Sequence, residues 1–427
     1  MKLRSRFVKK SLGRFARTML LLMPISLRYS FYRKFVKVPS KIDTSVRFKI
    51  AETKDELEQA FHLLYKAYVS VGLQQENESQ LRVTPYHALP STTILIGVKE
   101  DRVVATLSLI ADSAFGLPSD WAADLSDIRK RSKRVAEVSA LAIAKEYRGR
   151  LLWPLLKYMY EYCTRYFGAD ILIAALTTPS RAHELYESVL AFEKVEEQAT
   201  EDYAFSNYIP VVVEHLDLNK AVDKFAKLYA HKKNRKNLYS YFREFVDTRF
   251  VFPKREYYHL DDPVMTPELV DYFFNQATDC FQNLTVEQQV KLYSLLPTAE
   301  YRQLLPGTKF VTPIFAKDKR MRRFNVKCRG QLSVSQDQTL EMTVIDVSIG
   351  GFRAIVKGLE MGSQVYHSRI QVGDFEVIEV KCQKVWGFEN EVYGFKLQWP
   401  RDHKWEKLVA HLEQDLDRPQ EKVQKSA

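Results

Sequence analysis

The sequence is poor in cysteine and has no long apolar segment. Only 4 of its 427 residues are cysteines, and no two of them are spaced as C-x-x-C. This excludes a disulfide scaffold and argues against a zinc site built on paired cysteines, so we expect no metal. A helix that spans a bilayer needs about 20 consecutive apolar residues. The longest apolar run near the N-terminus, residues 19–27, is shorter and contains Pro24 and Ser26.

Positive charge is concentrated in the first 50 residues. These carry fourteen lysines and arginines against one acid, Asp43, whereas the other 377 residues carry slightly more acids than bases. The net charge of +11 is therefore the sum of a cationic arm and a nearly neutral body. Nucleic-acid binding is not expected, because such proteins spread their excess charge over a folded face or interleave it with exposed aromatic residues.

The cationic arm, residues 1–45, has the pattern of an amphipathic helix. At about 100° per residue, one face collects the apolar residues Val8, Leu12, Phe15, Met19, Leu22 and Met23. The opposite face collects the bases Lys9, Lys10, Arg14 and Arg17. The pattern predicts a helix on an anionic membrane surface, which would make the protein cytoplasmic and peripheral to the inner membrane. Two alternatives are that this helix packs on the body of the protein or that the arm is a targeting segment.

The body divides by pattern into three parts and a polar tail at residues 416–427. Residues 46–217 alternate strands and helices, residues 218–315 form a helical connector, and residues 316–415 read as a small β-barrel with frequent glycines. The fold class is α+β and multidomain. In the first part we expect strands at 47–51, 93–98, 103–110, 135–144 and 171–176, two strand-like runs within 204–215, and helices at 54–71, 151–167 and 181–190.

Two features of the first part suggest chemistry. Glu137 lies within an otherwise apolar strand, where a carboxylate must be paired, protonated or functional. The turn at residues 148–150, Arg148-Gly149-Arg150, precedes an apolar helix whose first backbone N–H groups suit a phosphate.

Residues 47–215 resemble the GNAT superfamily and, more narrowly, the N-acyl amino acid synthases related to autoinducer synthases. The resemblance is carried by Tyr65-Lys66-Ala67-Tyr68 with Gly72, by Gly116-Leu117-Pro118 within residues 112–120, by Glu137-Val138-Ser139, by Tyr147-Arg148-Gly149, and by Leu185-Tyr186 leading into Ala191-Phe192-Glu193. It departs from the family where Leu151 and Trp153 replace small residues of the pyrophosphate loop, where Ala140 replaces an arginine, and where Ala191 replaces a glycine.

The resemblance implies an enzyme that moves a fatty acyl group from acyl carrier protein to the amine of an amino acid. Glu137 would be the general base and Tyr186 the acid for the leaving thiolate. Arg148, Gly149 and Arg150 would hold the phosphopantetheine of the carrier, whose single phosphate requires less of a cradle than coenzyme A. The carrier is acidic, so the basic run Arg129, Lys130, Arg131, Lys133 and Arg134 is the expected docking patch, with residues 232–236 as an alternative.

The third part resembles a PilZ domain, the family that binds cyclic di-GMP through R-x-x-x-R and D/N-x-S-x-x-G motifs. Asp346, Ser348 and Gly351 match the second motif, and Lys319, Arg320, Arg322 and Arg323 stand at the first, with lysine at its leading position. The resemblance implies cyclic di-GMP binding and regulation, for which ordering of the arm at residues 320–323 is a candidate switch. A barrel that binds nothing is the alternative.

Together these features predict a membrane-associated bacterial N-acyltransferase with a cyclic di-GMP sensor. The rival interpretation is a non-catalytic cyclic di-GMP effector whose acyltransferase-like part is degenerate, as Ala140, Leu151 and Trp153 suggest.

Overall fold

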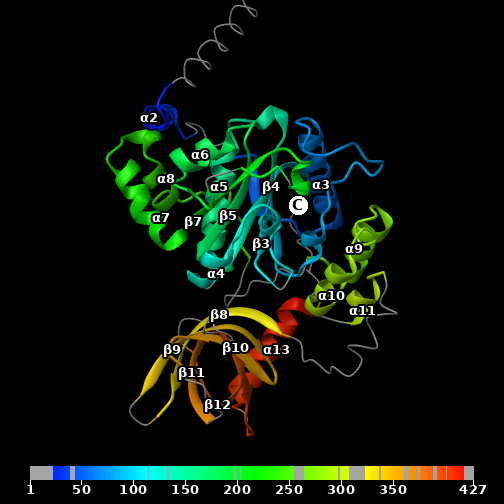
Figure 1. Cartoon of the computed structure of the whole chain (residues 1–427), viewed down its shortest axis with the longest axis vertical. Helices are drawn as coiled ribbons and strands as arrows, with labels where there is room; N and C mark the ends of the chain where they lie inside the picture. The colour runs from blue at the N-terminus through cyan, green and yellow to red at the C-terminus, as the bar shows by residue number, and fades with distance from the viewer. Residues whose placement is uncertain are drawn as a thin grey trace, which may run out of the picture.

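The computed structural model describes residues 23–38, 44–113, 115–131, 134–196, 199–201, 203–253, 264–296, 299–306, 323–335, 338–359, 365–372, 376–387, 392–400 and 402–417. Two bodies are seen in Figure 1: an α/β domain around a twisted sheet and, beyond it, a β-barrel.

The α/β domain is built on a seven-stranded sheet in the order β1-β2-β3-β4-β5-β7-β6. Neighbouring strands are antiparallel except β4 and β5, which are parallel. This confirms the predicted mixed α/β domain. The strands are β1 (Arg47–Ile50), β2 (Thr92–Lys99), β3 (Arg102–Ala111), β4 (Val135–Ile143), β5 (Ile171–Thr177), β6 (Glu193–Lys194) and β7 (Val211–Asp217).

Local sequence signals explain several element boundaries. Helix α3 (Lys54–Val69) begins at a capping box in which Thr53 and Glu56 satisfy each other's backbone N–H groups. The turn expected between β2 and β3 is present, with Glu100 and Asp101 both at positive φ. The strand expected at the start of 204–215 is absent, because residues 204–206 form a short helical turn.

Helices cover both faces of the sheet. One face carries α3, which contributes Leu57, Phe61 and other apolar side chains to a core with β2 and β5. The other face carries α5 (Leu152–Tyr162) and α6 (Ala182–Val189), whose side chains share a core with Leu172 and Leu216. These two layers correspond to the helices predicted at 54–71, 151–167 and 181–190.

The segment expected to be a connector is divided between the same two faces. Helices α7 (Leu218–Phe225) and α8 (Leu238–Arg243) add to the core beside α5 and α6. Helices α9 (Pro267–Asp271), α10 (Val286–Leu295) and α11 (Ala299–Gln303) follow, and residues of α9 and α10 add to the core beside α3. Much of the segment is thus part of the α/β domain.

Strand β4 departs from regular pairing where the site lies. Its pairing with β3 shifts register opposite Leu107, and Ala140 takes a positive φ of 54°, as expected at a β-bulge. Its pairing with β5 runs only from Val135 to Glu137, while β5 continues to pair with β7 along its whole length. The two parallel strands therefore separate after Glu137.

The predicted barrel is present as a closed structure in the order β10-β13-β12-β11-β8-β9. Helix α13 (His403–Asp417) packs against it through Trp405, Leu408, Val409 and Leu412. The strands are β8 (Phe324–Ser333), β9 (Thr339–Ser348), β10 (Gly351–Val356), β11 (Val365–Val372), β12 (Glu376–Gly387) and β13 (Val392–Leu397).

Of the cationic arm, the structure describes helix α2 (Ile25–Phe35), which lies on α6. The face predicted from residues 8–22 lies outside the described residues. Within the described part of the chain, no helix is long and apolar enough to cross a bilayer.

Candidate functional site

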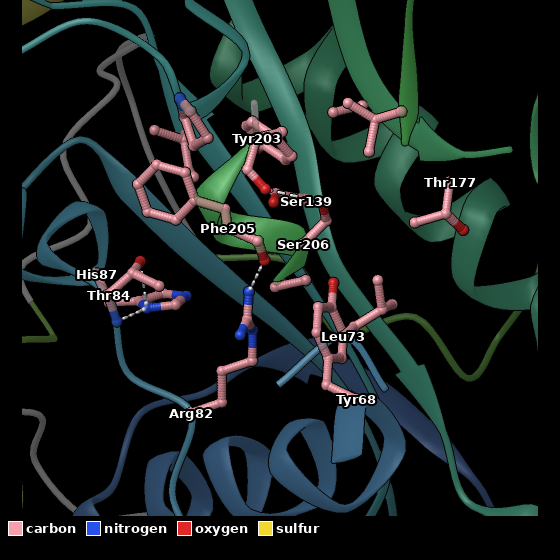
Figure 2. Close-up of a pocket in the computed structure, with 15 residues that line it drawn as sticks. Tyr68, Leu73, Arg82, Thr84, His87, Ser139, Thr177, Tyr203, Phe205 and Ser206 are labelled. Atoms are coloured by element: carbon pink, nitrogen blue, oxygen red, sulfur yellow. Dashed lines mark hydrogen bonds between the residues drawn. The ribbon is translucent and has the colours of Figure 1, made fainter. Parts of the chain in front are cut away.

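A cavity lies where β4 and β5 separate, on the face of the sheet that carries α3. Its volume is about 580 Å³, counting the space open to solvent. Ser139 and Ala140 of β4 and Ala175 and Thr177 of β5 form its floor. The rest of the wall is mostly aromatic or apolar and comprises Tyr68, Leu73, Arg82, Thr84, His87, Ile110, Pro118, Tyr203, Phe205, Ser206 and Val211 (Figure 2).

Glu137 lies two residues before Ser139, on the same face of β4. It is fully buried. Its Oε2 accepts a hydrogen bond of 2.8 Å from the backbone N–H of Ser119, and its Oε1 has no hydrogen-bond partner among the described residues. Burial raises the pKa of this carboxyl to about 7, against the opposing effect of Ser119. Glu137 therefore ionises near neutral pH, with one oxygen available to take a proton.

Tyr186 lies on α6, on the opposite face of the sheet from this cavity, and is not part of its wall. Its ring packs edge-on against Phe192, with 5.0 Å between centroids. Burial raises the pKa of the phenol, and the charges of Glu214 and Tyr68 add to that effect. Tyr186 thus stays protonated at neutral pH, as a proton donor must, and lies close enough to the cavity residue Tyr68 for the titrations of the two phenols to influence each other.

Arg82 was not predicted as a site residue, and it is the one charged side chain in the cavity wall formed by the described residues. Its Nη2 donates to the carbonyl oxygen of Phe205 at 2.6 Å, and its Nη1 donates to Oε1 of Gln74 at 3.0 Å. The guanidinium also stacks on the ring of Tyr68, 4.1 Å from the centroid. Arg82 belongs to a loop without helical or strand periodicity, so no sequence signal distinguished it from a surface arginine.

His87, on the short helical turn Pro85–Ala88, is also buried in this wall. The backbone N–H of Thr84 donates to its Nδ1 at 3.0 Å, so the proton of the neutral ring is on Nε2, which faces Oγ of Ser108 at 3.4 Å. Burial lowers the pKa of His87 to about 3, and the charge of Arg82 lowers it further. His87 is therefore uncharged at neutral pH, and the net positive charge of the wall comes from Arg82.

The predicted phosphate-binding turn precedes α5, as expected. Arg148, Gly149 and Arg150 are exposed there, and Gly149 has a φ of 81°. Arg150 donates to the carbonyl oxygen of Glu146 at 2.7 Å. Leu151 and Trp153, which replace small residues of the family, are buried in the core beneath the helix. Their side chains thus point into the protein, and the two arginines face solvent.

The basic run at 129–134 does not form one continuous surface patch. Arg129 makes paired hydrogen bonds to the carboxylates of Asp112 and Asp120, at 2.6 to 2.8 Å. Arg134 is buried and donates to the carbonyl oxygens of Val326 and Val344 in the barrel. Lys130 and Arg131 are solvent-accessible side chains of α4 (Ser126–Arg131), and Lys133 lies outside the described residues.

In the barrel, the motif residue Asp346 is fully buried and its carboxylate is shared by two arginines. Arg323 donates to Oδ1 and Arg353 of β10 donates to Oδ2. The sequence analysis named Arg323 and missed Arg353. Lys319, Arg320 and Arg322 lie outside the described residues.

The other two residues of this motif serve the barrel itself. Ser348 donates to the carbonyl oxygen of Gly351 at 3.1 Å, and its own carbonyl oxygen accepts from the indole of Trp405 at 3.1 Å. A side chain at position 351 would collide with the backbone carbonyl of Phe395. Gly351 is thus required by the close approach of β10 and β13, whereas the sequence analysis assigned its close approach to a ligand.

No group of histidine, cysteine and carboxylate side chains that could hold a metal ion occurs in the described ranges.

Comparisons with known proteins concern the α/β domain. FeeM, an N-acyl amino acid synthase from uncultured soil microbes, is 20% identical over 42% of this chain and 93% of that chain, with a TM-score of 0.35. BjaI, a CoA-dependent acyl-homoserine lactone synthase, is 17% identical over 43% and 88%, with a TM-score of 0.31. The putative acetyltransferase yncA from Salmonella typhimurium is 15% identical over 41% and 94%, with a TM-score of 0.30. No curated protein matches the chain.

One family model matches the sequence. It is described as N-acyl amino acid synthase FeeM, and the match covers residues 59–217. This range includes Glu137, Tyr186 and every residue of the cavity wall, and it ends before the barrel begins. The α/β domain of this chain thus matches the N-acyl amino acid synthase FeeM family over the segment that forms the cavity.

Proposed function

We propose that the α/β domain is an N-acyltransferase that moves a fatty acyl group from the thioester of acyl carrier protein to the amine of an amino acid. The observation that carries the proposal is Glu137, a buried carboxyl with a pKa of about 7 and an unpartnered oxygen. Glu137 is not itself part of the cavity wall; it lies two residues before Ser139, which belongs to the wall where β4 and β5 separate. An attacking amine must lose a proton, and a base with a pKa near neutrality suits this step.

The reaction would proceed by direct attack. The amine nitrogen bonds to the thioester carbonyl carbon, its proton passes to Glu137 directly or through water, and the carbon–sulfur bond breaks to release the thiol of the carrier. Tyr186 is protonated at neutral pH and lies on the other face of the sheet. For it to supply the proton to the leaving thiolate, the thioester would sit in the gap between the separated strands β4 and β5. The separated edges of β4 and β5 leave backbone N–H groups for the thioester oxygen.

A carrier protein is favoured over coenzyme A as donor by the turn before α5. Its exposed cations, Arg148 and Arg150, suit the single phosphate of phosphopantetheine, while no glycine-rich loop follows to embrace a pyrophosphate. The accessible cations Lys130 and Arg131 would contribute to docking of the acidic carrier.

The test is acyl transfer by the purified full-length chain. Acyl carrier protein loaded with fatty acyl groups of several lengths is mixed with the twenty amino acids, and mass spectrometry detects the N-acyl products. We expect products with the wild type and a loss of at least a hundredfold with Glu137→Gln. The absence of any product from the wild type, with either carrier or coenzyme A donors, would favour the rival non-catalytic effector.

We also propose that the barrel binds cyclic di-GMP beside Asp346. The ion cluster of Asp346, Arg323 and Arg353 holds two guanidinium groups, which pair well with phosphates and guanine edges, and one of them, Arg323, belongs to the first motif. Calorimetry on the full chain tests this. Binding in the micromolar range that is lost in Arg323→Ala supports it, and no heat from a folded protein at high micromolar ligand refutes it. Dependence of the transfer rate on the dinucleotide would support the regulatory role.

Attachment to an anionic membrane is proposed from α2. Its polar side lies on α6, where Tyr29 and Tyr32 donate to the carboxylates of Glu187 and Glu184 at 2.7 Å each. Its apolar residues Leu27 and Phe35 are more than half exposed, contrary to the usual arrangement of an amphipathic helix on a protein. This favours a lipid surface as the partner of the arm.

A further inference from the structure

The cavity contains a cation, Arg82, that has no anionic partner among the residues that the structure describes. Arg82 bonds to two neutral oxygens, of Phe205 and Gln74, and stacks on Tyr68. No aspartate or glutamate belongs to the described wall. A charge removed from water is costly unless an opposite charge meets it. Figure 2 shows the guanidinium reaching from its loop into the same space that Ser139, Tyr203 and Phe205 border.

We infer that this cavity is the acceptor site and that Arg82 binds the carboxylate of the amino acid acceptor. The inference rests on the acyl transfer proposed above and names the residue that holds the acceptor. Arginine pairs with carboxylates through two parallel hydrogen bonds, and hydrogen bonds to neutral oxygens leave its charge available for such a partner.

The remaining wall restricts the side chain of the acceptor. Tyr203, Phe205, Leu73, Ile110 and Val211 offer aromatic and apolar surface. His87 is uncharged because burial holds its pKa near 3. A cationic side chain would therefore meet Arg82 and no compensating carboxylate. An acceptor with a neutral, apolar or aromatic side chain fits this wall, with its amine directed to Ser139 and Glu137.

The experiment compares three acceptors that differ in one group: a neutral aromatic amino acid, its methyl ester, and the amine that lacks the carboxyl group. With wild-type enzyme we expect kcat/KM for the acid to exceed that for the ester and the amine by roughly ten- to hundredfold, the usual effect of a charge-assisted pair. In Arg82→Gln the ratio of kcat/KM for the acid to kcat/KM for the ester or the amine should fall to near one, mainly because the KM for the acid rises. The variant Arg82→Lys, which keeps the charge and loses the planar fork, should be intermediate.

Arg165→Gln is the matched control, because Arg165 is an exposed arginine of the same domain that pairs with Glu161 at 3.4 Å. We expect it to keep the preference for the acid. Equal use of acid and amine by the wild type, or an unchanged preference in a folded Arg82→Gln, would overturn the inference while leaving acyl transfer intact. If no acceptor is acylated, the proposed function fails, and the role of Arg82 is then tested by calorimetric binding of the amino acid without donor. Binding that is lost in Arg82→Gln and kept in Arg165→Gln supports the acceptor site. No binding to the wild type rejects it.

Discussion

Replacement of Glu137 by glutamine should inactivate the enzyme and yet stabilise it at alkaline pH. In the folded chain, burial raises the pKa of this carboxyl from its ordinary 4.5 to about 7, so folding favours the protonated form. The cost to folding is absent below pH 4.5, grows between pH 4.5 and 7, where the unfolded chain ionises and the folded chain does not, and is complete above pH 7. A shift of this size corresponds to about 3 kcal/mol above pH 7.

Glutamine cannot ionise, so Glu137→Gln escapes this penalty. Its carbonyl oxygen can still accept the hydrogen bond from Ser119, while its buried NH2 group, in place of an unpartnered oxygen, costs about 1 to 2 kcal/mol. We expect the variant to exceed the wild type by about 1 to 2 kcal/mol in unfolding free energy at pH 8 and to fall below it at pH 5. Urea unfolding of both proteins from pH 5 to 8 measures this difference.

Activity gives the second half of the test. The ratio of wild-type to variant kcat/KM removes the titration of the acceptor amine itself, and it should rise with pH and level off above an apparent pKa of about 7, at roughly 10²- to 10⁴-fold. Glu193→Gln is the control for the stability measurement. The hydrogen bond from Lys224 lowers the pKa of Glu193, so Glu193 stabilises the fold at neutral pH and this stabilisation is lost as the pH falls. The pH dependence of the unfolding free energy is therefore opposite in sign to that expected for Glu137. Unchanged turnover in Glu137→Gln, with lower stability at pH 8, would show a structural carboxylate and refute the reasoning.

Three further predictions concern the other proposed sites. Tyr186→Phe should lower kcat about tenfold or more with little change in KM for the acceptor, in steady-state assays; an unchanged kcat would remove it from proton transfer. Arg353→Ala leaves the buried Asp346 with one arginine fewer, so we expect at least tenfold weaker cyclic di-GMP binding by calorimetry, and unaltered affinity in a folded variant would exclude the cluster from the ligand site. Leu27→Ser with Phe35→Ser should reduce pelleting with anionic vesicles several-fold, and equal pelleting would deny α2 a lipid contact.

The sequence predicted the architecture of the α/β domain well, because its signals are local. Apolar periodicity, from which the strands and helices were predicted, involves residues close together in the chain. The same is true of Glu137, whose charge in an apolar strand is visible without any structure. The domain boundary predicted at residue 217 does not separate two structural units. Residues of α7 to α10 complete the cores on both faces of the sheet, through contacts between parts of the chain that are far apart in the sequence.

The acceptor side of the site was harder to predict for a physical reason. Arg82, Thr84 and His87 lie in a segment without periodicity. What makes Arg82 significant is that the described part of the folded wall contains no carboxylate. Gly351 shows the converse. Its motif suggested a ligand contact, whereas its neighbour across the barrel, Phe395, already requires a glycine there. A motif identifies the position, and only packing shows what the residue touches.

The basic run before β4 shows how a charge pattern can mislead in the same way. A run of bases normally forms a solvated face, and this one was expected to receive an acidic carrier protein. Its first member, Arg129, is neutralised by two aspartates, and its last, Arg134, enters the barrel between β8 and β9. Burial lowers the pKa of Arg134 to about 10, and Asp170, Cys328 and Asp346 oppose this effect. Arg134 therefore links the domain that holds Glu137 to the motif proposed for cyclic di-GMP. A ligand that draws Arg323 and Arg353 away from Asp346 would change the electrostatic environment of Arg134, which gives the proposed regulation a physical route along β4.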